Sequence, residues 1–319
     1  MRRALATAAL PFWDRRYRRL RALWRMALFL LSRSLMLMGL GALATLLHLW
    51  DAAPALVSVS ISALATLLPA YLCARWLDRR SHRALSLPPS RANWAELGLG
   101  LALGAAMMTL AAGVGLACGW LRLSAVWAGY AGPGSVTLPL VVWLLVGVHE
   151  EVWARGYLLA NLAEGLNVRW LSPRWALLLA WVGTSAYFGL LHADNPSASS
   201  TSTLAIVAAG LLLGLGVILT GRLGLAVGVH IAWNLFQGTV FGLPVSGYRL
   251  SPFSLLRLEA VGPRLWTGGA FGPEAGLLGA LGLLTGLAGT VLIARRRCGR
   301  LSLATTLTTP SLPEATGGD

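Results

Sequence analysis

Residues 136–160, VTLPLVVWLLVGVHEEVWARGYLLA, decide the interpretation of the chain because they place charged side chains inside an apolar segment. Residues 136–148 carry no charge, and the residues that follow Gly156 are again apolar. A charge at the centre of a bilayer costs ~2.5–3.5 kcal/mol on insertion scales, so a charged residue inside a span is a candidate for function. Glu150, Glu151 and Arg155 are the first such candidates.

The spacing of these three residues predicts two different environments for the two carboxylates. Glu151 and Arg155 are four positions apart, so they share one helix face, and an acid that precedes a base at this spacing pairs well with it. Glu150 is rotated by ~100° from Glu151 and can point elsewhere. We therefore expect Arg155 to hold Glu151 and to leave Glu150 free. The alternative is a charge cluster at a helix end among lipid headgroups.

Composition predicts an all-α fold, a polytopic membrane helical bundle. Of the 319 residues, 56% are hydrophobic and 12% are charged, about half the charge of a soluble domain. Apolar runs are continuous, whereas barrel strands would alternate. The net charge of +14 comes from arginines beside apolar runs, which is typical of topology signals, and no nucleic-acid partner is expected. Three distant cysteines indicate neither a disulfide framework nor a thiolate metal site.

Eight transmembrane spans are predicted, at approximately residues 24–49, 54–76, 94–121, 137–164, 175–192, 203–220, 223–243 and 269–294. Arg33 is expected to snorkel, or to precede the first span. Glycine pairs four apart predict close helix packing, at Gly100/Gly104, Gly115/Gly119 and Gly210/Gly214. The arginine distribution places both termini in the cytoplasm. The dissenting loop, 244–266, carries three arginines on the predicted outer side.

Two further groups of polar residues lie in apolar segments. His192 ends the fifth span, four residues after Phe188, and His230 and Asn234 share one face of the seventh span. A single His or Asn in a span is equally well explained by a hydrogen bond between helices. Because buried polar groups need partners, we expect Glu150, His192, His230 and Asn234 to lie together.

This set of side chains predicts hydrolysis by water. A carboxylate and an imidazole in an apolar pocket can act as a general base, and no Gly-x-Ser-x-Gly motif supplies a serine nucleophile. An imidazole and a carboxamide on one helix face can stabilise an oxyanion. Glu150, His192 and His230 are also a possible zinc set. However, Trp153 stands where a zincin motif starting at His149 would have its second histidine.

The three motifs Glu150-Glu151-x-x-x-Arg155, Phe188-x-x-x-His192 and His230-x-x-x-Asn234, in this order, resemble the CPBP family of intramembrane proteases. That family includes type II CAAX prenyl endopeptidases and bacterial relatives linked to bacteriocin processing and self-immunity. The resemblance implies that Glu150 and His192 activate water and that His230 and Asn234 form the oxyanion hole. It implies supporting roles for Glu151, Arg155 and Phe188.

The resemblance and the spans together predict the domain organisation. We expect a basic cytoplasmic arm, N-terminal transmembrane helices, a CPBP-like catalytic core, an outer loop with the last span, and a disordered tail, at residues 1–22, 23–135, 136–243, 244–300 and 301–319. The protein is expected in a bacterial cytoplasmic membrane, among membrane lipids, acting on a peptide or membrane-protein substrate. No cofactor is required in the preferred mechanism, with zinc as the alternative.

Two other functions remain open at this point. A non-catalytic immunity or partner-binding protein on the same scaffold would not need Glu150. A proton-coupled transporter would use Glu150 and the histidines as a relay. The ionisable residues inside spans lie in the second half of the chain only, whereas a transporter would favour broken spans in both halves.

Overall fold

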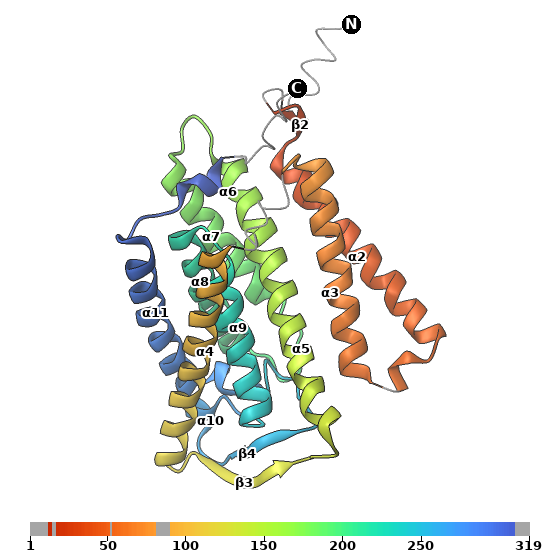
Figure 1. Cartoon of the computed structure of the whole chain (residues 1–319), viewed down its shortest axis with the longest axis vertical. Coiled ribbons are helices and arrows are strands. Elements are labelled where there is room, and N and C mark those ends of the chain that lie inside the picture. Colours follow the sequence, from red (N-terminus) through yellow and green to blue (C-terminus); the bar gives the residue numbers. More distant parts are fainter. Residues whose placement is uncertain (1–11, 15–16, 52, 81–89, 310–319) are drawn as a thin grey trace, which may run out of the picture.

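Helices make up most of the computed structural model, which describes residues 12–14, 17–51, 53–80 and 90–309 (Figure 1). The main helices are α2 (Ala22–Leu46), α3 (Pro54–Leu72), α4 (Arg91–Ala117), α5 (Pro133–Glu151), α6 (Ala160–Leu166), α7 (Pro173–Leu190), α8 (Ser200–Thr220), α9 (Gly224–Leu235) and α11 (Leu277–Cys298). Three π-helical turns continue α3, α5 and α9, namely η2 (Cys73–Leu77), η4 (Val152–Leu159) and η5 (Phe236–Val240). Short helical pieces are η1 (Leu49–Asp51), α10 (Arg264–Thr267), η6 (Pro273–Ala275) and η7 (Thr305–Thr308).

The predicted class, an all-α membrane bundle, is confirmed. In the described part of the chain, six helical segments are long and apolar enough to cross a membrane. Helices occupy all eight predicted positions, but α7 and α9 are not among those six. The predicted count of eight spans is therefore not confirmed.

Helix α9 occupies the centre of the bundle, between α4 and α5 (Figure 1). A Cβ atom at Gly100 would collide with the carbonyl oxygen of Leu225, and one at Gly104 with that of Val229. These two glycines therefore let the backbones of α4 and α9 touch, as their spacing predicts. Gly210 likewise packs on Ser185 of α7.

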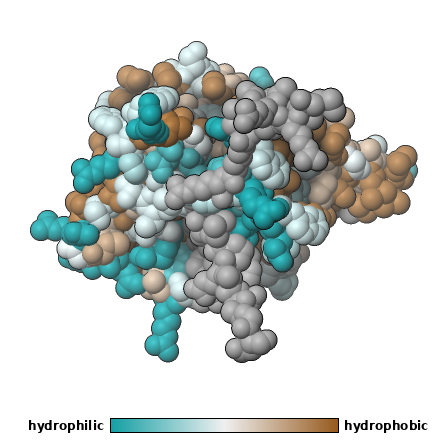
Figure 2. Space-filling model, turned by 90° about the horizontal axis from the view of Figure 1, so that it is seen from above, coloured by the Kyte–Doolittle hydropathy of each residue, from teal (hydrophilic) through white to brown (hydrophobic). Residues whose placement is uncertain are grey.

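The hairpin of α2 and α3 stands at one side of the bundle, where α3 packs on α5 and α2 contacts α6 (Figure 1). Large apolar side chains of α2 are exposed, among them Leu28, Leu31, Leu35 and Met38. In the view from above, this hairpin forms an apolar lobe at the right, while hydrophilic side chains gather on the end face (Figure 2). This distribution suits a hairpin that faces lipid along its sides.

The end of the bundle opposite β2 carries a two-stranded sheet that the sequence did not predict. Strand β3 (Leu121–Ala128) pairs antiparallel with β4 (Ser254–Ala260), from Leu121 opposite Ala260 to Ala128 opposite Ser254. The third predicted span was too long, because α4 ends at Ala117 and Gly119 turns the chain with a φ of 69°. A Cβ at Gly119 would meet nothing, so the packing expected for Gly119 is wrong.

A buried ion-pair network closes the other end of the bundle. Glu164 accepts hydrogen bonds from Arg19, Arg25 and Arg80, and Asp78 accepts from Arg25 and from Asn161, both at 3.0 Å. Arg19 belongs to β2 (Arg19–Leu20), which pairs with β1 (Trp13–Asp14), and is only 2% exposed. It is therefore not part of a basic arm on a lipid surface. The rest of that predicted arm, residues 1–11 and 15–16, lies outside the described residues.

The first nine residues of the predicted tail, 301–309, pack on the bundle. Turn η7 contacts α6 and α7. Asn167 Nδ2 donates to the carbonyl of Thr308 (3.1 Å), and Thr308 is 1% exposed. The expectation of disorder is therefore wrong for these residues, because the turn η7 packs on the surface of α6 and α7. Residues 310–319 lie outside the described part.

Candidate active site

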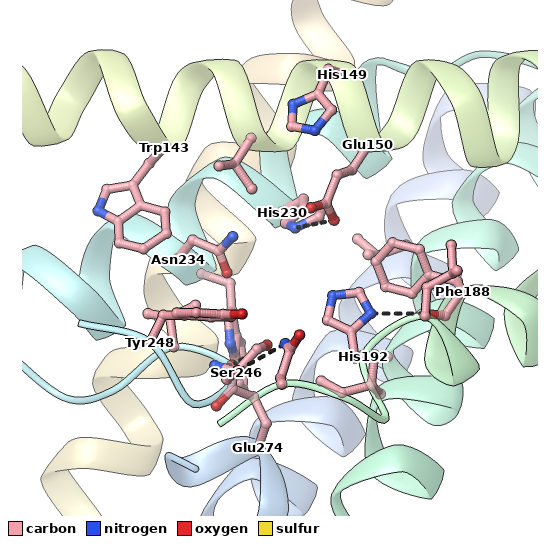
Figure 3. A pocket seen from close by; sticks show the side chains of 18 of the residues that line it. Trp143, His149, Glu150, Phe188, His192, His230, Asn234, Ser246, Tyr248 and Glu274 are labelled. Atoms are coloured by element: carbon pink, nitrogen blue, oxygen red, sulfur yellow. Dashed lines mark hydrogen bonds and ion pairs between the residues drawn. The ribbon is translucent and has the colours of Figure 1, made fainter. Parts of the chain in front are cut away.

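The adjacent carboxylates Glu150 and Glu151 lie in the last turn of α5, immediately before the π turn η4. Arg155 Nη1 donates to Glu151 Oε1 (2.7 Å), and Arg155 Nη2 donates to the carbonyl of Gly210 (3.0 Å). Both partners of the ion pair are buried. Glu151 is held by Arg155, as the spacing predicts, although the intervening turn is π-helical. Glu150 instead points into a cavity (Figure 3).

The imidazole of His230, on α9, lies between the two glutamates. Its Nδ1 is 2.8 Å from Glu151 Oε1, and its Nε2 is 3.8 Å from Glu150 Oε2. Because an ionised carboxylate only accepts hydrogen bonds, Nδ1 carries a proton. Nε2 can then donate to a bound oxyanion only when the ring carries a proton on each nitrogen.

His192 follows α7 and reaches the cavity with one nitrogen fixed. Its Nδ1 is 2.8 Å from the carbonyl oxygen of Phe188. A carbonyl only accepts, so Nδ1 is the donor, and in the neutral ring Nε2 keeps a lone pair. Nε2 can therefore take a proton from a water molecule. The Phe188 ring packs against the His192 ring, with centroids 4.8 Å apart.

Asn234 lies one helical turn after His230, on the same face of α9. Its carboxamide points into the cavity (Figure 3), and no described residue makes a hydrogen bond with this side chain. The cavity has a volume of about 410 Å³. Glu150, His192, His230 and Asn234 all line it. The structure thus brings together the four side chains that three separate segments of sequence supply.

His192 and His230 line one cavity, although the predicted spans placed them near opposite ends. Helix α9 begins beside the start of α4, where Gly224 N donates to Asn93 Oδ1 (2.8 Å). The loop after His192 stays at the cavity, where Asn195 Nδ2 donates to the carbonyl of Ser246 (2.9 Å). The boundaries were wrong, and the predicted grouping of side chains is found.

Sequence reasoning missed two charged residues of the cavity wall. Arg33 lines the cavity and lies well inside α2, so neither snorkelling nor a later start of the span describes it. Glu274 accepts from Ser246 N (3.0 Å) and Gln237 Nε2 (2.6 Å). Burial raises the pKa of Glu274 to about 7. Arg33 and Glu274 are each a single charge within an apolar stretch, and this is the one sequence signal that could have identified them as site residues.

Further cavity residues were not assigned a role from sequence, including His149, Trp143, Tyr248 and Ser246. His149 Nδ1 donates to the carbonyl of Leu145 (2.7 Å), which fixes its tautomer as Phe188 fixes that of His192. Trp143 Nε1 donates to Thr239 (2.9 Å) and so joins α5 to η5. The cavity wall is therefore formed by side chains from several helices and turns.

The possible zinc set of Glu150, His192 and His230 stays a prediction. Within the described ranges, no group of three or more His, Cys, Asp or Glu side chains lies close enough to hold a metal ion. We therefore derive no reaction step through a metal.

A comparison with known protein families identifies the segment that contains the candidate site. Residues 132–236 match the family model described as type II CAAX prenyl endopeptidase Rce1-like. The chain contains an Rce1-like domain. No curated protein and no solved structure matches the chain. The Rce1-like domain confirms the resemblance to the CPBP family and indicates a CAAX-type membrane protease, hence a hydrolase. It contains Glu150, His192, His230 and Asn234, whereas Arg33 and Glu274 lie outside it.

Proposed function

We propose that the protein is an intramembrane endopeptidase that hydrolyses a peptide bond of a membrane-associated substrate with an activated water molecule. The observation that carries this proposal is the arrangement of Glu150, His192 and Asn234 around one cavity within an Rce1-like domain. A free carboxylate and an imidazole with an available lone pair are the groups that general-base catalysis needs.

In the proposed reaction, a water molecule between Glu150 and His192 attacks the carbonyl carbon of the scissile bond. The water proton passes to this pair as the carbon–oxygen bond forms, and the carbonyl oxygen becomes an oxyanion. Asn234 Nδ2 and the protonated Nε2 of His230 donate hydrogen bonds to that oxyanion. The C–N bond then breaks, and the stored proton passes to the leaving amine.

The remaining residues of the three motifs orient these groups. Glu151 fixes the ring of His230 through Nδ1 (2.8 Å), and Arg155 holds Glu151 (2.7 Å). The Phe188 carbonyl fixes His192 (2.8 Å). Arg155 also lies over the Phe188 ring, with its guanidinium carbon 4.4 Å from the ring centroid. Buried contacts of this kind hold catalytic groups within the tolerance that a reaction requires.

The proposed mechanism requires no cofactor, since water, two ionisable side chains and two hydrogen-bond donors complete it. The substrate we propose is a peptide or a segment of a membrane protein, because a CAAX-type protease acts on membrane-associated peptides. Lipids would surround the apolar sides of α2 and α3. We propose that both termini lie in the cytoplasm because of the arginine distribution. We assign the protein to a bacterial membrane because the sequence contains no lysine.

A cleavage screen tests the proposal. The full chain would be purified in detergent and incubated with a library of peptides, and mass spectrometry would identify the products. We expect cleavage by the wild type and none above background by Glu150→Gln. Cleavage by both proteins at equal rates would exclude Glu150 as the base. Cleavage by neither, with peptide binding retained, would support the partner-binding alternative, and proton flux in vesicles would support the transporter.

A further inference from the structure

Arg33 lies inside a predicted membrane span and opens onto the same cavity as Glu150. It belongs to α2, outside the Rce1-like domain. The hydroxyl-bearing residues Ser58 and Ser62 of α3 line the cavity as well. The mechanism proposed above gives Arg33 no role. An intramembrane arginine without a structural explanation is a candidate for function.

Two contacts hold the guanidinium of Arg33, and neither contact involves Nη1 or Nη2. Nε donates to Thr66 Oγ1 of α3 (3.1 Å). The guanidinium carbon lies 5.7 Å from the centre of the Trp153 ring, in η4. One contact uses Nε and the other uses the flat face, so neither occupies Nη1 or Nη2. Those two groups form the fork that binds a carboxylate with two parallel hydrogen bonds.

Arg33 is half-buried, and the fully buried arginines of the described chain differ from it in their partners as well. Each has a carboxylate within ion-pair distance, Glu164 or Glu151, and they are Arg19, Arg25, Arg80 and Arg155. Arg33 forms no ion pair with any described residue. The carboxylate side chains outside the described part are Glu314 and Asp319. The fold thus holds a cation at the cavity that no described carboxylate contacts directly, and the carboxylate whose charge acts on it is Glu150, the proposed base.

We propose that Arg33 binds a carboxylate of the peptide substrate, in a subsite beside Glu150. The subsite rests on the proposed peptidase function and adds to it a substrate-binding residue outside the Rce1-like domain, one that favours peptides with a carboxylate near the scissile bond. Arg33 and Glu150 line one cavity and interact electrostatically, so a single short peptide can reach both. The carboxylate comes either from the C-terminus of the peptide or from an aspartate or glutamate side chain.

Peptide binding tests the subsite without requiring turnover. The full chain with Glu150→Gln would be placed in nanodiscs and titrated against three fluorescein-labelled apolar heptapeptide mixtures. One ends in a carboxylate, one ends in a carboxamide, and one has a carboxamide end and an internal glutamate. Hydrogen bonds between charged groups predict ~10–100-fold tighter binding of one carboxylate mixture than of the uncharged mixture. The mixture that is preferred identifies the source of the carboxylate.

Variants then assign the preference to Arg33. Arg33→Gln in the same background should remove it, and Arg33→Lys, which keeps the charge but not the fork, should reduce it. Arg174→Gln removes an exposed positive charge of α7 and should leave the preference unchanged. Equal binding of all three mixtures by the parent protein overturns the subsite, and this measurement needs no Arg33 variant to fold. Retention of the preference in a monodisperse Arg33→Gln protein also overturns it.

The subsite and the peptidase function fail in different ways. An absence of cleavage in the library screen, together with Arg33-dependent binding of carboxylates, would refute the peptidase and leave the subsite. Cleavage that depends on Glu150 but does not depend on a substrate carboxylate would support the peptidase function and refute the subsite. Arg33 could instead act only on the charge of Glu150. In the protein with Glu150 intact, Arg33→Gln would then lower kcat equally for all three mixtures and leave their relative affinities unchanged. That result contradicts the subsite.

Discussion

His230 Nδ1 lies 2.8 Å from Glu151 Oε1, the same oxygen that accepts a hydrogen bond from Arg155 at 2.7 Å. One carboxylate oxygen therefore connects two elements of the candidate site, α9 and η4. Glu150, the neighbouring residue, lies 3.8 Å from His230 Nε2, makes no hydrogen bond with a described residue, and faces the cavity. Two identical side chains at consecutive positions consequently have separable functions, and this relationship leads to the first prediction.

Glu150→Gln and Glu151→Gln should both lower activity, but only Glu151→Gln should also lower stability. Glu150→Gln preserves shape and removes the base, so we expect peptide hydrolysis to fall by ~10²–10⁴ with little loss of thermal stability. Glu151→Gln leaves Arg155 buried without its charge partner, so we expect a lower unfolding temperature as well as lower activity. Cleavage rates and thermal unfolding in detergent distinguish the two. A Glu150→Gln protein that cleaves as fast as the wild type contradicts the assignment.

Arg155→Ala should destabilise the protein. The substitution leaves Glu151 buried without its arginine, and loss of one partner of a buried ion pair typically costs ~3–5 kcal/mol in the free energy of unfolding. Arg174→Ala, at an exposed position, is the matched control and should have little effect. Thermal unfolding monitored by circular dichroism provides the comparison. An Arg155→Ala protein with wild-type stability and no activity would instead indicate a contact between Arg155 and substrate.

Asn234→Ala should lower kcat and leave KM nearly unchanged. An oxyanion-hole donor acts only as negative charge develops, and loss of one such donor costs ~10²–10³ in kcat. The measurement is steady-state kinetics on a peptide from the cleavage screen. Asn234→Asp, which presents a negative charge to the oxyanion, should be at least as impaired. A large rise in KM at constant kcat would show that Asn234 binds the substrate instead.

Metal removal should not abolish cleavage. The reaction proposed here uses side chains and water, so we expect activity to persist after incubation with a chelator, with less than one zinc per chain by elemental analysis. His230→Ala should lose activity without any change in metal content. Stoichiometric zinc in the wild type, lost together with activity in His230→Ala, would establish the zinc-dependent alternative, because a three-ligand site does not survive loss of one ligand.

Glu274 should make stability depend on pH near neutrality. Burial raises its pKa from an ordinary value of 4.5 to about 7, so the folded protein holds a proton that the unfolded chain releases. Its contribution is present below the lower value and is lost as pH rises through the higher one, a fall of about 3 kcal/mol in the free energy of unfolding. Glu274→Gln does not titrate and should flatten this dependence.

The measurement for Glu274 is the thermal unfolding temperature of the full chain between pH 5 and pH 8. Glu259→Gln removes an exposed carboxylate of β4 and serves as the control. It should retain the decline in stability that the wild type shows over this range. An equal decline in the wild type and in Glu274→Gln would show that another group is responsible.

The local relationships of the site were predictable because helical spacing determines them. Residues four apart on one helix must share a face, which is why Glu151 meets Arg155 and why His230 and Asn234 point the same way. The membrane class follows equally from long apolar runs. These features need no knowledge of how distant segments meet.

Features that join distant segments could not be predicted from spacing. The β3–β4 sheet pairs segments on opposite sides of the Rce1-like domain, and single-sequence patterns contain no signal for such pairing. Arg33 and Glu274 likewise enter the cavity from α2 and η6. The burial of Arg19 against Glu164 was missed because an arginine-rich segment at a terminus is usually solvated.

The composition of the cavity wall has a consequence for how such a protein changes over generations. The groups proposed to break the bond lie within residues 132–236, whereas Arg33 and Glu274 come from segments on either side. Substitutions in α2 or in η6 can therefore alter which molecules are accepted while the chemistry is inherited intact. Selection for a different substrate would therefore act first on those flanking segments. The same segments are the first targets for engineering a change of substrate.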